Sequence, residues 1–346
     1  MLLALAVAVA AEESRPFVVT PYAWIRPSFA WRQDDEALVS DTDGFSVAAR
    51  AGLEGAADRI GLRGRVEVEL QPEPVLKDAF VNWTPHAVVS VNTGQMKVPF
   101  SVQQLASDTR RQFPLDAPLV DAMEIGRDMG VSAEGRLLLA KKPRLSVTTG
   151  VFNGEGANRL ENVNDRFMFA QRVVVAPLGM RERPMEGTGR EPYFHLGGGW
   201  VYNYTGADAT AEESNTLQAE VQFAFRWVSI QGEFADREVE HGSVEVADYH
   251  ATAAYGQLGC FIPVKWAEDH IEVVGRGAWT EPNDALAEGP EELATLAVDA
   301  GLNVYVPRTP KWMHDVKLGA AFRHNVQLEG TELDDDRLDV SFTVRF

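Results

Sequence analysis

Charged side chains recur at every second position in several segments of this 346-residue chain. In residues 61–70, GLRGRVEVEL, the side chains of Arg63, Arg65, Glu67 and Glu69 alternate with Leu, Gly and Val. A guanidinium group stays charged and binds an oxyanion through two parallel hydrogen bonds. Rows of such groups predict either the guidance of small anions along a path or ion pairs with nearby carboxylates that brace the structure.

Residue patterns that carry catalysis or hold a cofactor are absent from the sequence. It contains no GxSxG nucleophile motif and no phosphate-cradling glycine loop. His195, His250 and His270 lack the spacing of a metal site, and the single cysteine, Cys260, permits neither an internal disulfide nor a thiolate cluster. We therefore predict a protein that is not an enzyme, with no catalytic residues, no metal and no cofactor.

The overall charge excludes one class of partner. The chain has 32 Lys and Arg against 51 Asp and Glu, which gives a formal net charge of −19. Nucleic-acid binding needs a basic surface that neutralises phosphates. We therefore expect no nucleic-acid partner.

The segments that carry the alternating charges are predicted to be strands. Helical periodicity is scarce, and Leu217 and Phe225, for example, oppose Gln218 and Glu220 along one such segment. The predicted strands are 17–31, 44–54, 60–70, 75–84, 87–97, 128–138, 143–153, 166–176, 193–205, 216–226, 228–238, 246–258, 268–280, 294–306, 313–325 and 336–346.

Strand length and connections choose between two folds that alternation alone permits, a soluble sandwich and a barrel in lipid. Strands of about 9 to 11 residues cross the hydrocarbon layer when tilted, whereas soluble strands usually run about 5 or 6 residues. The connections also alternate between long, acidic ones and short ones, except near 71–74 and 177–192. We therefore predict an all-β fold, a transmembrane antiparallel β-barrel of about 16 strands.

The N-terminus is predicted to be an export signal. Residues 1–11 form an apolar run that ends in small residues before an acidic stretch, which is typical of a signal peptide, although a basic n-region is missing and a short buried strand is the alternative. No later stretch of 18 apolar residues predicts a transmembrane helix. Residues 12–346 are therefore expected to form a single barrel.

The polar face of each strand is predicted to enclose a water-filled lumen. Bases and acids on these faces are about balanced, so the acidic excess must lie mainly in the connections. The predicted pore-lining residues are Arg50, Arg63, Arg65, Glu67, Glu69, Arg136, Arg144, Arg172, Arg226, Arg276, Lys317, Arg323 and Arg345.

The third connection, residues 98–127, is predicted to fold into the lumen as a constriction. A connection of this length is unusual in a compact fold unless it has a function. The predicted constriction residues are Lys97, Arg110, Arg111 and Arg127, although acids in the same segment are able to cancel their charge. The alternative is a plain surface loop.

Several motifs resemble a known family. They are RAGLEG at Arg50–Gly55, the run DAFVNWTPHAVVSVNTGQMKVPFS over residues 78–101, RDMGVSAEGRL at Arg127–Leu137, TGVFNGEGANRLENVND at Thr149–Asp165 and QRVVVAPLG at Gln171–Gly179. In this order they are similar to the phosphate-selective porin O and P family. The terminal Phe346 resembles the assembly signal of outer-membrane barrels.

The resemblance implies a sixteen-stranded trimeric porin of the bacterial outer membrane, narrowed by its third loop. It implies passive diffusion of small hydrophilic solutes or ions, including anions such as phosphate. Expected partners are outer-membrane lipid, lipopolysaccharide, the permeating ions or solutes, and two further copies in a homotrimer. The chain has few lysines, and Lys97 alone is placed in a matching motif. The alternatives are an outer-membrane β-barrel enzyme and a soluble secreted β-protein.

Overall fold

The computed structural model describes most of the chain. The described residues are 17–34, 39–123, 125–180, 192–206, 211–243, 246–268, 270–285, 294–306, 316–328 and 334–346. The expected signal peptide over residues 1–11 lies outside these ranges.

Sixteen antiparallel strands form one closed barrel, as the alternation predicted. Each strand hydrogen-bonds to its neighbours in sequence, and β1 closes the ring against β16. The strands are β1 (Val18–Asp34), β2 (Val39–Ala57), β3 (Leu62–Glu69), β4 (Val75–His86), β5 (Val89–Lys97), β6 (Arg127–Leu139), β7 (Lys142–Phe152), β8 (Met168–Val175), β9 (Tyr193–Thr205), β10 (Glu212–Phe225), β11 (Val228–His241), β12 (Tyr249–Phe261), β13 (Ile271–Glu281), β14 (Thr295–Tyr305), β15 (Val316–Gln327) and β16 (Asp334–Arg345).

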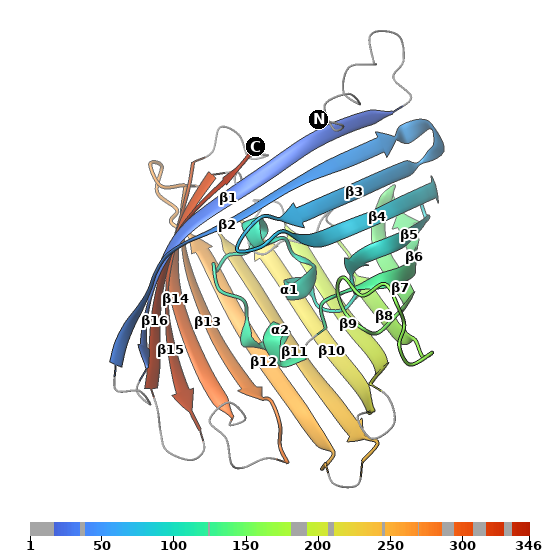
Figure 1. The fold of residues 1–346 in the computed structure, drawn as a ribbon. Helices are drawn as coiled ribbons and strands as arrows, with labels where there is room; N and C mark the ends of the chain where they lie inside the picture. The colour runs from blue at the N-terminus through green and yellow to red at the C-terminus, as the bar shows by residue number, and fades with distance from the viewer. Residues whose placement is uncertain are drawn as a thin grey trace.

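The closing pair brings the two ends of the barrel sheet together. Trp24 pairs with Arg345 and Trp31 with Leu338, and the Phe346 N–H donates to the Ala23 carbonyl at 2.9 Å. Figure 1 shows β1 beside β16 at this closure. Among the sixteen described strands, closure leaves none at an edge of the sheet, which is the condition for a sheet to lie in lipid.

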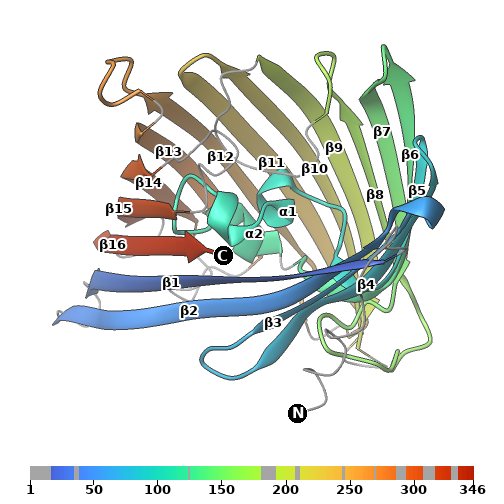
Figure 2. The ribbon, with the colours of Figure 1, turned by 90° about the horizontal axis from the view of Figure 1, so that it is seen from above.

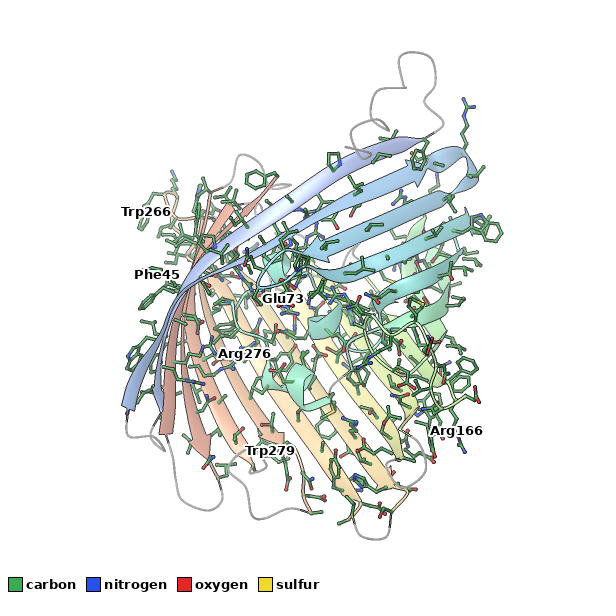
Figure 3. The ribbon with its side chains drawn as sticks, viewed as in Figure 1. Phe45, Glu73, Arg166, Trp266, Arg276 and Trp279 are labelled. Atoms are coloured by element: carbon green, nitrogen blue, oxygen red, sulfur yellow. The ribbon has the colours of Figure 1, made fainter. Side chains whose placement is uncertain are left out.

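The two faces of the wall differ in polarity. On β10, Gln218 and Gln222 are buried on the inner face, while Leu217 and Phe223 are 55% and 40% exposed on the outer face. Phe45 of β2 is 89% exposed and points away from the wall in Figure 3. An apolar outer surface around a polar interior is the arrangement of a barrel that spans a membrane.

Three connections at one end of the barrel are tight turns, whereas β12 and β13 are joined there through 262–270 and β14 and β15 through 306–315. Residues 87–88, 140–141 and 226–227 are two-residue turns. Ala140 and Lys141 both have positive φ, 52° and 63°, which is the backbone of the turn that matches the twist of paired strands. The two predicted exceptions are confirmed, because β3 and β4 are joined through 70–74 and β8 and β9 through 176–192.

The third connection folds inside the barrel. It contains α1 (Val102–Leu105), η2 (Asp108–Arg110) and α2 (Pro118–Met123). Seen from above, α1 and α2 lie within the ring of strands (Figure 2). Phe100, Leu119 and Met123 pack with inward side chains such as Val201 and Ala253, so an apolar cluster forms inside an otherwise polar lumen. In the described part of the chain, no helix has the length and apolar character needed to cross a membrane.

Strand boundaries differ from expectation at several ends. β2 begins at Val39 and β10 at Glu212, each earlier than alternation suggested. Polar residues at these ends continue the ladder, as where Arg32 pairs with Asp41 and Glu212 with His241. Pairing with a neighbour therefore extends strands beyond the reach of their apolar pattern.

Candidate functional site

The inward loop begins with a capped helical turn. The Ser101 hydroxyl accepts a hydrogen bond from the Gln104 N–H at 3.0 Å, which is a typical helix N-cap. The Lys97 ammonium donates to the Gln104 and Ala106 carbonyls at 2.6 and 2.7 Å. Lys97, predicted as a constriction residue, therefore ties β5 to the loop.

Two wall carboxylates hold the first turn of α1 against β10 and β11. The Val102 N–H donates to Glu220 Oε2 at 2.8 Å, and the Gln103 N–H donates to Glu233 Oε1 at 2.9 Å. Gln218 Nε2 donates to both carboxylates at 2.9 Å. These acceptors satisfy backbone donors that a helix start leaves without partners.

The opposite wall holds the next part of the loop. Arg50 Nη2 of β2 lies 2.6 Å from Asp108 Oδ2. In the closed ring β2 and β10 lie on opposite sides. Residues 102–108 therefore cross the lumen between the two walls, which is the geometry of a constriction.

Beyond this crossing, the loop is attached to β13, β14 and β15. Lys317 Nζ donates to the Arg111 carbonyl at 2.6 Å, and Arg323 Nη2 donates to the Asp116 carbonyl at 2.8 Å. Arg276 donates to the same Asp116 carbonyl at 3.1 Å and pairs with Asp299 at 2.5 Å. Figure 3 places Arg276 inside the barrel beside the loop.

A polar and an aromatic side chain complete this attachment. Gln112 Nε2 donates to Glu272 at 2.6 Å and to Ser229 at 3.0 Å. Phe113 is buried against Val274, with the Arg276 guanidinium 4.6 Å from its ring centroid. A Cβ built on Gly301 would lie 3.0 Å from the Phe113 ring, so the missing side chain of Gly301 makes room for it.

Asp108 is the centre of a cationic cluster, which we define as Arg26, Arg50, Lys97 and Arg111 around Asp108. Arg50 contacts the carboxylate directly, Arg111 Nη2 lies 3.4 Å from Oδ1, and Lys97 and Arg26 act on it electrostatically. Burial by itself would raise the pKa of Asp108, but the four cations, Arg111 and Arg50 first, hold it well below its usual range. The carboxylate therefore stays charged at physiological pH.

The structure places the four predicted constriction residues as follows. Lys97 and Arg111 belong to the cationic cluster. Arg127 donates to Asp78 at 2.8 Å and acts electrostatically on Lys97. Arg110 lies half-buried in η2. The loop thus brings the predicted residues to one region of the lumen, each with protein partners.

Most of the predicted pore-lining residues carry ion pairs or hydrogen bonds. Arg65 pairs with Glu67 at 2.6 Å, and Arg136 pairs with Glu134 at 2.6 Å. The residues with such partners are Arg50, Arg65, Glu67, Glu69, Arg136, Arg172, Arg276, Lys317 and Arg323. These contacts favour the bracing interpretation for much of the wall.

Four predicted lining residues have other surroundings. Arg63 is largely exposed and lies 4.0 Å from Asp58 beside the β2–β3 turn, and the Arg345 guanidinium lies 5.9 Å from the Tyr22 ring centroid. Arg144 is half-buried on β7. Arg226 lies in the two-residue turn after β10, exposed, with positive φ and its guanidinium over the Phe225 ring. At this strand end, alternation does not define which side chain faces inward.

The sequence analysis did not predict that Trp24 and Arg26 of β1 face the lumen. Trp24 of β1 is buried on the inner face, and the Arg26 and Arg50 guanidinium groups lie 5.7 and 5.1 Å from its ring centroid. An inward tryptophan interrupts the apolar-out, polar-in pattern, so Arg26 was not assigned to the lumen. Arg26 lies an even number of residues from Ser28 and Arg32 along β1. This spacing was the available signal that the three side chains face the same side of the strand.

His195, one of the histidines considered in the sequence, lies in a hydrogen-bonded network of the wall. Among the described residues, no group of three or more His, Cys, Asp or Glu side chains is arranged to hold a metal ion. His195 instead lies 2.6 Å from Glu220 through Nε2 and 3.0 Å from the Tyr193 hydroxyl. The inner wall and the loop therefore carry charged groups and hydrogen-bond donors inside the barrel.

Comparison with known proteins identifies both a family segment and a fold. Residues 42–186 match the family described as Phosphate-selective porin O and P, which confirms the resemblance over that range. No curated protein sequence matches the chain.

Solved structures share the whole barrel. The anion-selective porin from Comamonas acidovorans is 12% identical and superposes with a TM-score of 0.67, covering 95% of this chain and 100% of its own. The outer membrane channel DcaP of Acinetobacter baumannii is 11% identical with a TM-score of 0.64, covering 98% and 100%. OmpT, an outer membrane protein of Vibrio cholerae, is 10% identical with a TM-score of 0.61, covering 96% and 99%. At these identities the likeness establishes the fold.

Proposed function

We propose that this chain, an outer-membrane porin with a segment matching the phosphate-selective porin O and P family, admits small hydrophilic solutes by passive diffusion and prefers anions at its constriction. The constriction is the region where residues 102–108 cross the lumen. Selection takes place there because fixed charges act most strongly on an ion where the path is narrowest.

One observation carries the proposal: a closed barrel has a polar inner wall, and its third connection is fastened across the lumen on a cluster of four cations around one carboxylate. A wide aqueous wall of paired charges is nearly neutral to a passing ion. The cationic cluster has an excess of positive charge among its own members. These four cations favour anions, including phosphate, and the neighbouring acids reduce that preference.

The inner wall supports only a mild preference. Glu67 and Glu69 lie 3.6 and 3.2 Å from Arg50, and Asp116 also pairs with Arg111. These acids flank the cluster and reduce its field. The solved barrel from Comamonas acidovorans is described as anion-selective, which supports the same sign of selectivity here.

The outer face supports the proposed partners. Apolar side chains such as Val221, Phe234 and Leu258 cover it, which suits the lipid of an outer membrane and, in the outer leaflet, lipopolysaccharide. We propose a homotrimer from the family resemblance. We also propose that the protein has no enzymatic activity, since the inner wall's polar side chains pair with one another and with the loop.

Liposome swelling tests the proposal directly. Folded protein is reconstituted into liposomes. The liposomes are then diluted into isotonic solutions of a neutral sugar, of potassium phosphate or of a cationic solute of similar size. We expect swelling with all three, fastest with phosphate relative to its size. Liposomes that do not swell with any of them, although they contain heat-modifiable folded barrel, would contradict the proposal.

A further inference from the structure

We infer that Asp108 is a tethered occupant of a carboxylate-binding site within the lumen, and that this site takes the carboxylate of a small solute once Asp108 is removed. The inference rests on the proposed function, because it names the chemical group that the constriction recognises. It also makes Asp108 the residue that weakens the selectivity of the wild-type channel.

Two guanidinium groups contact the Asp108 carboxylate, one from the wall and one from the loop. Arg50 Nη2, from the wall strand β2, lies 2.6 Å from Oδ2, and Arg111 Nη2, from the loop itself, lies 3.4 Å from Oδ1. Each carboxylate oxygen thus has its own guanidinium. Lys97 and Arg26 add positive charge from two further strands. This is the arrangement with which proteins bind free carboxylates.

The cations are held in place by contacts other than Asp108. Arg50 also pairs with Glu69 at 3.2 Å and lies over the Trp24 ring. Arg111 also pairs with Asp116. Lys97 donates to two loop carbonyls. Because every direct ligand has a second anchor, the cradle persists when the Asp108 carboxylate is absent.

The loop also remains docked without Asp108. Its neighbouring attachments are the Val102 and Gln103 N–H groups on Glu220 and Glu233, and the Arg111 carbonyl on Lys317. Removal of one side chain between these anchors leaves the loop fastened on both sides. The loss of Asp108 is therefore a change of charge and of volume at a fixed position.

Asp108 is more exposed than the two guanidinium groups that contact it. The Asp108 side chain is 15% exposed, whereas Arg50 and Arg111 are 10% and 8% exposed, so the carboxylate shields its cations from the lumen. A carboxylate on the same chain has a high local concentration and outcompetes a dilute solute. It prevents anions from binding so tightly that they stop conducting, since conduction requires binding sites that ions also leave.

Planar-bilayer recording with acetate as the probe tests the inference. Asp108→Ala empties the site, Asp108→Asn fills it with a neutral amide, and Asp58→Ala removes one charge from the exposed β2–β3 turn as a matched control. In a potassium chloride gradient we expect both Asp108 variants to raise the anion-to-cation permeability ratio by about threefold, as loss of one nearby charge predicts. Asp58→Ala should leave the ratio unchanged.

Acetate separates a binding site from a simple charge effect. We expect acetate to reduce the chloride current of Asp108→Ala with saturation and to return its permeability ratio to the wild-type value. Asp108→Asn and the wild type should show no saturation at the same concentrations. A linear response of Asp108→Ala to acetate would overturn the inference, as would an unchanged ratio in Asp108→Asn if Asp108→Ala does not fold.

These outcomes are distinct from failure of the proposed function. Wild-type protein that forms no channels contradicts the porin proposal itself. Wild-type channels together with Asp108 variants that behave like Asp58→Ala overturn only the inference about Asp108.

Discussion

Glu220 of β10 and Glu233 of β11 lie directly opposite each other, and the Gln218 amide donates to both carboxylates at 2.9 Å. Like charges in this position are normally destabilising. Here each carboxylate accepts a backbone N–H from the first turn of α1, and Glu220 is also paired with Arg172. The pair is therefore a docking point for the loop that enters the lumen.

We predict that Glu220→Gln and Glu233→Gln together weaken this docking. Each change replaces a carboxyl group by an amide, and a typical hydrogen bond contributes about 1 kcal/mol. The loop should leave the wall more often, which single-channel recording detects as increased open-channel noise. Glu212→Gln, near the end of the same strand, is the control and should leave the open-channel noise unchanged. Equal noise in all variants would contradict a docking role for the pair.

Phe113→Ala should release the far end of the loop. Loss of a buried phenylalanine costs about 3 kcal/mol or more, and here the contacts with Val274 and the Arg276 guanidinium disappear. We expect trypsin to cleave after Arg110 or Arg111 in the folded variant, while the wild type resists because Arg111 is buried. Phe45→Ala, on the outer face, should remain resistant. Resistance of Phe113→Ala would show that other contacts suffice to hold the loop.

Trp24→Ala should enlarge the channel and loosen its cations. The ring supports Arg26 and Arg50, and each cation–π contact contributes about 1 kcal/mol. We expect a higher single-channel conductance, with Trp24→Phe close to the wild type because it keeps an aromatic face. Trp83→Ala, which changes an exposed tryptophan on β4, is the matched control. An unchanged conductance in Trp24→Ala would place the ring away from the conducting path.

Acidification should neutralise Asp121 in α2 before it neutralises Asp108. Burial raises the pKa of Asp121 above its ordinary value, against the opposing effects of Arg323 and Arg111, whereas the pKa of Asp108 is held well below its ordinary value. As the pH falls toward the ordinary range of aspartate, about 4, Asp121 therefore loses its charge while Asp108 keeps its own. The anion-to-cation permeability ratio should rise in this window. Asp121→Asn should have the raised ratio already at neutral pH and lack that step on acidification; the same pH profile in both proteins would refute the assignment.

The barrel was predictable from sequence because its strands and turns depend on residues that are close together in the chain. Alternation of side chains such as Leu217 and Gln218 specifies two faces, and turn residues mark the strand ends. The long third connection also signalled an inward loop, because a connection of this length is unusual in a compact fold unless it has a function. Family motifs in the first half of the chain pointed to the same fold.

The organisation of the constriction was not predictable in the same way. Which wall each loop residue meets depends on pairings across the ring, such as Arg50 with Asp108 and Lys317 with the Arg111 carbonyl. Sequence separation gives no measure of these distances. Trp24 was missed because an aromatic residue is expected on the outer face, whereas this one lies on the inner face. Arg226 was predicted to line the pore because it is charged, but it lies in a turn.

The most direct test of the account is the reversal potential of the wild-type protein in a planar bilayer under a potassium chloride gradient. We predict discrete conductance steps and a reversal potential displaced toward the equilibrium potential of chloride. Folded protein that gives no conductance steps, or steps whose reversal potential lies at the equilibrium potential of potassium, would contradict an anion-preferring porin.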